Sequence, residues 1–474
     1  MGVGRQTIGR SRGGIFEVQS SHTPTRRFTP VFDEDHLVSA GGLPAVMGLA
    51  ERAGFTGLLK ARLTVASPNA PVKVRALVSG MLAGADDIDG MDVLRSGGTA
   101  KVLGAVRAPS TLGTHLRSFT HGHTLQLGAI NRDLQANLAH LVPTLFGSDE
   151  LVMVDLDDTI REVHGYAKQA VAYGYNHVKR LNALVATIST EHSAPVIAGA
   201  QLRRGNVKSG DHAAWHATRA LTLAKKVRPA AQIMGRADSA FCTCTFVHAF
   251  QDAGCWFSVT VPQWSSVIRA ITMIEEDAWV GIHYPDAIFE EDTGEWISDA
   301  EVAEVPFTAF TSHPKKDQVT CRLIVRRVKR LNTKAHTGQG ELFDTYRYHP
   351  FITNSTLAML EADERHRGHA IIEQVMAELK GNALAHLPSG RFTANAAWLQ
   401  LAILAFNISR AAAHKAGMNT ARMPTIRQRL VMVPARIAHR SRRRFLHYPT
   451  HWPWQQELMN LWDHATGSDP PIAA

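Results

Sequence analysis

The stretch LVMVDLDDT, residues 151–159, marks the change of pattern that decides the fold. Before residue 148, apolar residues recur at helical spacing, as in VKVRALVSGMLAGA at 72–85. The stretch at 151–159 is instead a short apolar run that ends in acids, which is typical of a buried strand. Further strands are predicted for LNALVATIST at 181–190 and PVIAGAQL at 195–202. The chain therefore changes from an all-helical part to an α/β part near residue 150.

The elements that follow suit a mixed sheet flanked by helices. The sequence predicts, in order, a helix at 209–227, a strand at 230–238, a helix at 246–254, a strand at 255–261 and one long helix at 361–381. Three consecutive strands followed by alternating helices and strands favour a mixed rather than an all-antiparallel sheet. The predicted fold class is α/β.

Composition sets the broad class of the protein. Of its 474 residues, 45% are hydrophobic and 20% are charged, which is typical of a globular protein and excludes a largely disordered chain. The longest nearly apolar run, 396–408, contains Gln400 and Asn407 and is too short to span a bilayer, so no membrane partner is expected. The first residues lack the apolar stretch of a secretory signal, which makes a cytoplasmic location the expectation. None of the four cysteines stands in a C-x-x-C pair, and we expect reduced packing residues.

Charge is distributed unevenly along the chain. The formal net charge is +9 and the isoelectric point about 9.5, which suggests a polyanionic partner. Residues 270–304 hold eleven acidic residues and no Lys or Arg, whereas 422–444 hold eight Arg and no acid. The acidic stretch contains short alternating pieces and is predicted to be a strand-rich insertion. The two stretches are expected to lie on different surfaces.

Acidic side chains stand where strands end. Asp155 and Asp157 are two residues apart and share a face of their strand, while Asp158 points the other way. Asp238 ends the strand at 230–238. Carboxylate oxygens are the ligands that Mg²⁺ prefers, and two such ions about 4 Å apart can stabilise both the attacking and the leaving oxygen at a phosphate. The pattern points to metal-dependent phosphoryl transfer, although an Asp in the place of Asp238 is also a common helix cap.

The long predicted helix offers a third carboxylate, Glu373. Apolar residues at helical spacing form the stripe that would dock this helix on the sheet: Ile372, Val375, Met376 and Leu379. A second stripe beside it contains His366, His369, Glu373 and Lys380, at intervals of three, four and seven. This stripe is either an ordinary solvated face or part of the site.

The acids alone leave a second enzyme class open. A hydrophobic strand followed by D-x-D-x-T resembles the first motif of haloacid-dehalogenase phosphatases, in which Asp155 would be the nucleophile and Asp157 the acid/base. That family also needs a later acidic pair. MGRADSAF, at 234–241, has Asp238 but no second acid at the required spacing, so this alternative has less support.

Taken together, the motifs carry a family resemblance. VDLDDT, RADSAF, HAIIEQVMAELKG and the following LAHLPSGRFTANAAWLQLAILAFN resemble the DDE transposases of bacterial insertion sequences, in particular the insertion-sequence 1380 family, transposase DDE domain group 1. The resemblance covers nearly the whole chain. It implies an RNase H-like fold with an insertion before the Glu-bearing helix. It also implies that Asp157, Asp238 and Glu373 are the catalytic, metal-binding acids, with Asp155 as a further metal ligand and close second choice for the first acid.

The resemblance also implies an activity and its partners. Such a transposase binds the terminal inverted repeats of its element and uses two Mg²⁺ ions, for which Mn²⁺ can substitute, to cleave double-stranded DNA and join it to target DNA. The active form implied is a homodimer in a synaptic complex, in the bacterial cytoplasm at the nucleoid. A non-catalytic DNA-binding descendant of a transposase is a further alternative.

The expected DNA contacts follow from the same resemblance. Relatives carry Tyr and Arg where this chain has His366 and His369, so the end-binding role is expected to fall on these imidazoles, Lys380 and the neighbouring Arg367. Three consecutive arginines would add sequence-independent phosphate contacts: Arg442, Arg443 and Arg444.

The expected organisation has five parts. They are a helical DNA-binding domain at 1–148, the first part of the catalytic core at 149–262, the strand-rich insertion at 263–345, the second part of the core at 346–413, and a basic C-terminal region at 414–474.

Overall fold

The computed structural model describes most of the chain. The described residues are 29–104, 106–164, 168–174, 177–282, 289–290, 295–296, 300–329 and 346–467. The chain forms two compact units, residues 1–35 and residues 36–474. Every helix and strand described below belongs to the second unit.

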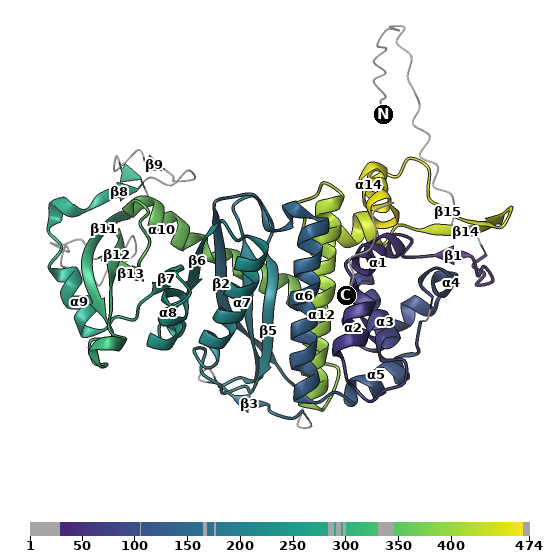
Figure 1. The fold of residues 1–474 in the computed structure, drawn as a ribbon, viewed down its shortest axis with the longest axis horizontal. Helices are drawn as coiled ribbons and strands as arrows, with labels where there is room; N and C mark the ends of the chain where they lie inside the picture. The colour runs from purple at the N-terminus through teal and green to yellow at the C-terminus, as the bar shows by residue number, and fades with distance from the viewer. Residues whose placement is uncertain are drawn as a thin grey trace, which may run out of the picture. The chain divides into compact units, whose positions relative to one another are not determined.

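A ten-stranded mixed sheet forms the centre of the described part of this unit (Figure 1). The order across the sheet is β5, β4, β2, β6, β7, β13, β12, β11, β8, and the short β3 also pairs with β4. Strands β2, β6 and β7 are parallel, and the pairings of β4 and of β13, β12, β11 and β8 are antiparallel. The strands are β2 (Leu151–Glu162), β3 (Ala172–Tyr173), β4 (Lys179–Ser189), β5 (Val196–Arg203), β6 (Gln232–Ala237), β7 (Trp256–Thr260), β8 (Val280–Ile282), β11 (Ala300–Ala309), β12 (Val319–Lys329) and β13 (Tyr346–Thr353). The predicted mixed α/β fold is confirmed.

Alternate residues of β4 show which helices cover each face of the sheet. One set packs with α7 (Ala213–Val227) and α8 (Cys244–Gln251): Leu184, Ala186 and Ile188. The other set packs with α11 (Ile371–Lys380): Leu181, Ala183 and Val185. In the register of β2 with β4, Asp157 stands opposite Val185 and Asp158 opposite Leu184. Asp157 therefore faces α11 and Asp158 faces α7, since residues opposite each other share a face.

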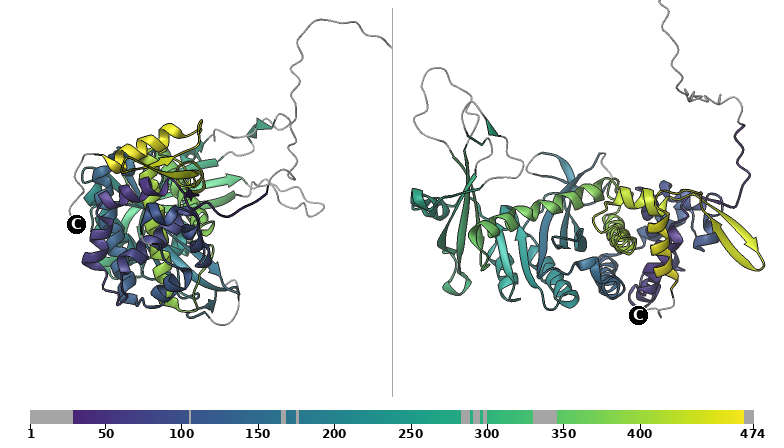
Figure 2. Two further views of the ribbon diagram at one scale, coloured as in Figure 1. Left: turned by 90° about the vertical axis from the view of Figure 1, so that its right-hand side faces the viewer. Right: turned by 90° about the horizontal axis from the view of Figure 1, so that it is seen from above.

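The helix predicted at 361–381 is interrupted. It consists of α10 (Met359–Arg367), a 3₁₀ turn at Gly368–Ala370 and α11, lying across the strands on the face opposite α7 and α8 (Figure 2). The cause is Arg236 of β6, whose Nη1 donates to the carbonyl of Arg365 at 2.5 Å. A Cβ at Gly368 would stand 2.7 Å from that Nη1, so the close passage of the guanidinium requires glycine. The single long helix was therefore wrong in this detail.

Helix α12 (Phe392–Lys415) is the most deeply buried helix in the described structure, between β5, α6 (His121–Leu141) and α3 (Ala70–Ala83) (Figure 1). By length and composition it could cross a membrane, but 94% of its apolar window is buried inside the protein, as in a core helix. Its polar residues close the edge of β5. Gln400 Nε2 donates to the carbonyl of Ala200 at 2.7 Å, and Asn407 both donates to and accepts from the backbone of Ile197, each at 2.9 Å. These amides stand where a further strand would otherwise pair.

The two ends of the second unit fold together. Strand β1 (Leu37–Val38) pairs with β14 (Ala435–Arg440), and α1 (Leu43–Arg52) packs against α14 (Gln455–Thr466). Between them lie further short helices, including α2 (Phe55–Arg62) and α5 (Pro109–Arg117). The described segments of the second unit that fall within the predicted regions 1–148 and 414–474 thus share one packed cluster, and the separate functions of these regions stay predictions.

The acidic insertion extends the sheet beyond β13. Part of its charge is neutralised within it, because Arg327 of β12 contacts Glu276 and Glu301, and Arg322 contacts Glu304. The remaining parts of the stretch, at 283–288, 291–294 and 297–299, lie outside the described residues. The acidic stretch is therefore matched in part by arginines of the same insertion.

Candidate metal centre

Asp157 and Asp238 come together where the pairing of β2 with β6 ends. Strand β2 itself continues past Asp157 to Glu162, paired with β4, so the prediction that Asp157 stands at a strand end was wrong. The last paired residues of β2 and β6 are Leu156 and Ala237, so each Asp is the next residue on one of two strands about 4.8 Å apart. Asp157 Oδ1 accepts from the backbone N–H of Asp158 at 2.7 Å, and Asp238 Oδ1 accepts from that of Ala240 at 2.9 Å. The structure thus brings the first two predicted acids side by side.

The surroundings of these two carboxyls disfavour their charged forms. Burial raises the pKa of Asp157 to about 6, and the charges of Asp238 and Asp158 act in the same direction. Burial likewise raises the pKa of Asp238, with a further contribution from Asp158. His369 opposes both shifts but does not cancel them. A pair of carboxylates with too little positive charge nearby fits a site that a cation completes.

Glu373 approaches from α11, which packs on β2. Two contacts fix the segment that contains α11 to strand β2. His369 Nδ1 meets Asp155 Oδ1 at 2.8 Å, and Arg161 donates to the carbonyl of Ala385. The chain after His369 continues as α11, whose apolar residues pack with Leu181, Ala183 and Val185 of β4. Glu373 stands one turn, about 6 Å, beyond His369 along this helix. Glu373 thus belongs to the helix that covers the face of the sheet on which Asp157 stands.

The site is open. Glu373 is exposed, while Ile372 and Met376 on either side pack in the cluster that contains Val185, the cross-strand neighbour of Asp157. Among the described residues, Asp157, Asp238 and Glu373 do not form a trio with ligand atoms all within 4.8 Å of one another.

Asp155 has different surroundings from the other acids. It is 0% exposed, and both its oxygens accept from Arg236, at 2.7 Å and 2.8 Å, while His369 binds one of them. Burial alone would raise the pKa of Asp155, but the charges of Arg236 and His369 hold it below its usual value. A carboxylate engaged in this way is poorly placed to bind a metal ion or to attack a phosphate. The geometry therefore favours Asp157 as the first catalytic acid and gives no support to the phosphatase alternative.

The residues of α10 that were predicted to contact DNA bind groups of the protein itself. Both ring nitrogens of His366 bind hydroxyls of β7, Ser258 at 2.8 Å and Thr260 at 3.0 Å, and its ring stacks on Phe351 at 4.0 Å. Burial lowers the pKa of His366 to about 3, so this imidazole is neutral at physiological pH. Arg367 donates to the buried Asp363 at 2.8 Å. His366 holds α10 on the sheet in this structure, Arg367 pairs within α10, and His369 binds the continuing segment to Asp155 of β2.

The remaining predicted contacts are more accessible. Lys380 is partly exposed at the end of α11. Strands β14 and β15 (Arg443–His447) form a hairpin whose two turn residues, Ser441 and Arg442, both have positive φ, 51° and 65°. The hairpin tip exposes all three predicted arginines: Arg442, Arg443 and Arg444. Two non-glycine residues in left-handed conformations make a tight two-residue turn.

Arg236 is the site residue that the sequence motifs did not single out. It lies two residues before Asp238 in the strand QIMGRA and is 3% exposed. A charge within an otherwise apolar strand is seldom buried without a partner. An arginine within an apolar strand could therefore have indicated that an acid of the neighbouring strand β2 pairs with it.

A mixed sheet of this order, flanked by helices and with Asp157 and Asp238 on adjacent parallel strands beneath the helix that carries Glu373, is consistent with an RNase H-like core. The family model described as transposase DDE domain group 1 matches residues 21–466. The chain therefore belongs to this family of DDE transposases. No curated protein matches the chain. Membership of the insertion-sequence 1380 family stays a prediction.

Proposed function

We propose that this transposase binds the terminal inverted repeats of an insertion sequence, cleaves the DNA there and joins the ends to target DNA. The observation that carries the proposal is the pair of carboxyls, Asp157 and Asp238, held side by side with raised pKa values on the sheet face that the Glu373 helix covers. Family membership supports transposition as the process. The repeats, the cleavage and the strand transfer are our inference.

The acids have a defined task in this proposal. Asp157, Asp238 and Glu373 would hold the metal, with Mg²⁺ as the natural ion because all three supply carboxylate oxygens. Two bound Mg²⁺ ions would supply Lewis-acid stabilisation of the attacking and leaving oxygens of a phosphodiester. Asp155 and Arg236 would position His369 and the helix that carries Glu373. His369 stands close enough to influence all three acids of β2 and β6.

DNA would be held by basic residues away from the acids. The exposed arginines at the hairpin tip and Lys380 can contact phosphates, whereas His366 and Arg367 are assigned to positioning by their contacts with the sheet and Asp363. A homodimer in a synaptic complex on double-stranded DNA, at the nucleoid of a bacterial cytoplasm, completes the proposal.

The decisive experiment is cleavage of labelled inverted-repeat DNA with Mg²⁺ by the full chain. Asp157→Asn, Asp238→Asn and Glu373→Gln should each abolish cleavage while leaving DNA binding intact. Asp252→Asn is the matched control, because this exposed carboxyl ends α8 away from the acids. Binding without cleavage by the unaltered protein would make it a non-catalytic descendant.

The phosphatase alternative has its own readout. Hydrolysis of para-nitrophenyl phosphate that requires Asp155 and tolerates Glu373→Gln would replace the transposase proposal. We expect no such turnover, because Arg236 occupies both oxygens of Asp155.

A further inference from the structure

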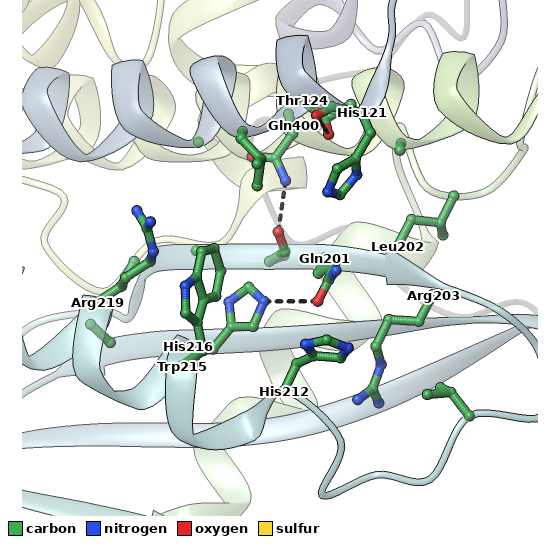
Figure 3. A pocket seen from close by; sticks show the side chains of 18 of the residues that line it. His121, Thr124, Gln201, Leu202, Arg203, His212, Trp215, His216, Arg219 and Gln400 are labelled. Carbon is green, nitrogen blue, oxygen red and sulfur yellow. Dashed lines mark hydrogen bonds between the residues drawn. The ribbon is translucent and has the colours of Figure 1, made fainter. Parts of the chain in front are cut away.

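A cavity of about 360 Å³ lies at the β5 edge of the sheet, apart from the acids (Figure 3). Its walls come from α6, β5, the start of α7 and the start of α12. The volume is within the range of sites that bind small organic ligands. No step proposed above uses this cavity.

The lining is strongly basic. It contains four Arg and three His, and none of the lining residues in the described structure is Asp or Glu. Arg203 is engaged, because it donates to Asp158 at 2.6 Å and to Asn182 at 2.8 Å. Arg132 and Arg204, by contrast, make no hydrogen bond or ion pair with the described residues. The cavity therefore holds guanidinium groups whose charge is not matched within it.

The crowding of positive charge affects the groups themselves. Burial lowers the pKa of Arg132 to about 10, with Arg219 acting in the same direction. Burial lowers the pKa of His216 to about 3, and nearby arginines and His212 contribute. An anion in the cavity would relieve both effects.

An aromatic ring stands at the same place. Trp215, on the first turn of α7, is 42% exposed, and the guanidinium carbon of Arg219 lies 3.9 Å from its ring centre. Figure 3 shows Trp215, His216 and Arg219 projecting from the same helix. An accessible tryptophan beside an arginine is a platform on which a nucleobase can stack.

One buried acceptor has no protein partner. Gln400 is 6% exposed, and its Nε2 donates to the carbonyl of Ala200, which fixes the orientation of the amide. Its Oε1, at the cavity wall, has no hydrogen-bond partner among the described residues. Leaving a buried acceptor unpaired is costly, so a donor from a ligand would be stabilising here.

We propose that this cavity binds one nucleotide, either free or as an unpaired nucleotide of a DNA strand. The phosphate would bind Arg132 and Arg204. The base would stack at Trp215 and present an amino group to Gln400 Oε1. The cavity and the acids lie on opposite faces of the sheet, and the link between them is Arg203 in the cavity wall, which pairs with Asp158, the residue after Asp157.

The test measures binding by the full chain carrying Asp157→Asn, so that the result does not depend on cleavage. The probes are deoxyadenosine monophosphate, inorganic phosphate, a flush-ended duplex and the same duplex with one unpaired terminal nucleotide. Arg132→Gln and Gly128→Leu are the variants. A Cβ at Gly128 would meet Gln400 Oε1 at 3.6 Å and Arg132 Nη1 at 3.7 Å, so a longer side chain fills the cavity from α6. Lys226→Gln, an exposed residue at the far end of α7, is the control with the same change of charge.

We expect both variants to weaken binding at least tenfold while Lys226→Gln has no effect. Loss confined to deoxyadenosine monophosphate identifies a free nucleotide, and loss of the preference for the unpaired end identifies a nucleotide of DNA. The proposal is overturned if neither variant changes the binding of any probe, or if inorganic phosphate binds as tightly as the nucleotide. Leucine is a better helix former than glycine, so Gly128→Leu provides a folded variant if Arg132→Gln is unstable.

Discussion

Asp155 and Asp157 lie on one face of the same strand, two residues apart, and have opposite surroundings. The inner layer, at Asp155, is a closed ion-pair network with Arg236 and His369, and the pKa of Asp155 is lowered. The outer layer, at Asp157 and Asp238, has no such guanidinium among the described residues, and the pKa of Asp157 is raised to about 6. The protein thus neutralises the inner carboxylate with its own Arg236, whereas the proposed function assigns the outer pair to a cation from solution.

The largest expected effect concerns the outer layer. Asp157→Asn should lower DNA cleavage at least about 1,000-fold, since metal stabilisation of transition-state charge is worth several kcal/mol. The fold should be retained because Asp157 makes no ion pair with the described residues. Single-turnover cleavage and Tm measured on the same preparation test this, and retained cleavage would shift the role of first acid to Asp155.

The inner layer should respond in stability. Asp155→Ala leaves the guanidinium of Arg236 buried and unpaired, which should cost about 3–5 kcal/mol of unfolding free energy. Urea denaturation measures it. Replacing both partners, Asp155→Ala with Arg236→Met, should recover part of the loss. A single variant as stable as the unaltered protein would contradict the network's importance.

The dependence of stability on pH should also distinguish Asp157 from Asp155, with a smaller effect. The folded-state pKa of Asp157 lies above its usual value, so the fold favours the protonated form. The metal-free protein should therefore lose stability as pH rises from about 4 through about 6, relative to Asp157→Asn. Mg²⁺ binds the carboxylates, so the Tm increase that it causes should grow over the same interval. Equal Tm increases at pH 5 and pH 7 would contradict a raised pKa at the metal centre.

The smallest effect is expected far from both layers. Replacing the hairpin arginines, Arg442, Arg443 and Arg444, by Ala should weaken DNA binding for all sequences alike. The slope of log K against log salt should become shallower by about 1 for each phosphate that the variant no longer binds. Cleavage at saturating DNA should not change. An unaltered slope would show that the hairpin does not contact phosphate.

Local patterns were enough to predict some of these features. The shared face of Asp155 and Asp157 and the apolar stripe beside Glu373 follow from periods of two and 3.6 residues, which neighbouring residues determine. The continuation of β2 past Asp157 to Glu162 does not, because it depends on pairing with β4. The break at Gly368 could not be predicted, because it depends on Arg236 from another strand. The ion pair of Asp155 has the same origin, since strand alternation shows which residues share a face but not which cation faces them.

The basic cavity could be predicted even less from local sequence patterns. Arg132, Trp215 and Gln400 come from three helices, and each has an ordinary explanation in its own segment. In the sequence, Gln400 stands out only as a polar residue that interrupts the apolar run at 396–408. Only the packing of α12 against β5 and α6 shows that its amide is shared between a strand edge and a cavity.

The amides that close β5 also limit how two copies of the protein can meet. Backbone groups of Ile197 and Ala200 are already bonded to Asn407 and Gln400. A second copy cannot lengthen the sheet at this edge unless α12 first withdraws, and α12 is buried within the fold. The β5 edge is therefore closed to strand addition by a second copy. The same closure protects this edge from the strand pairing that leads to aggregation.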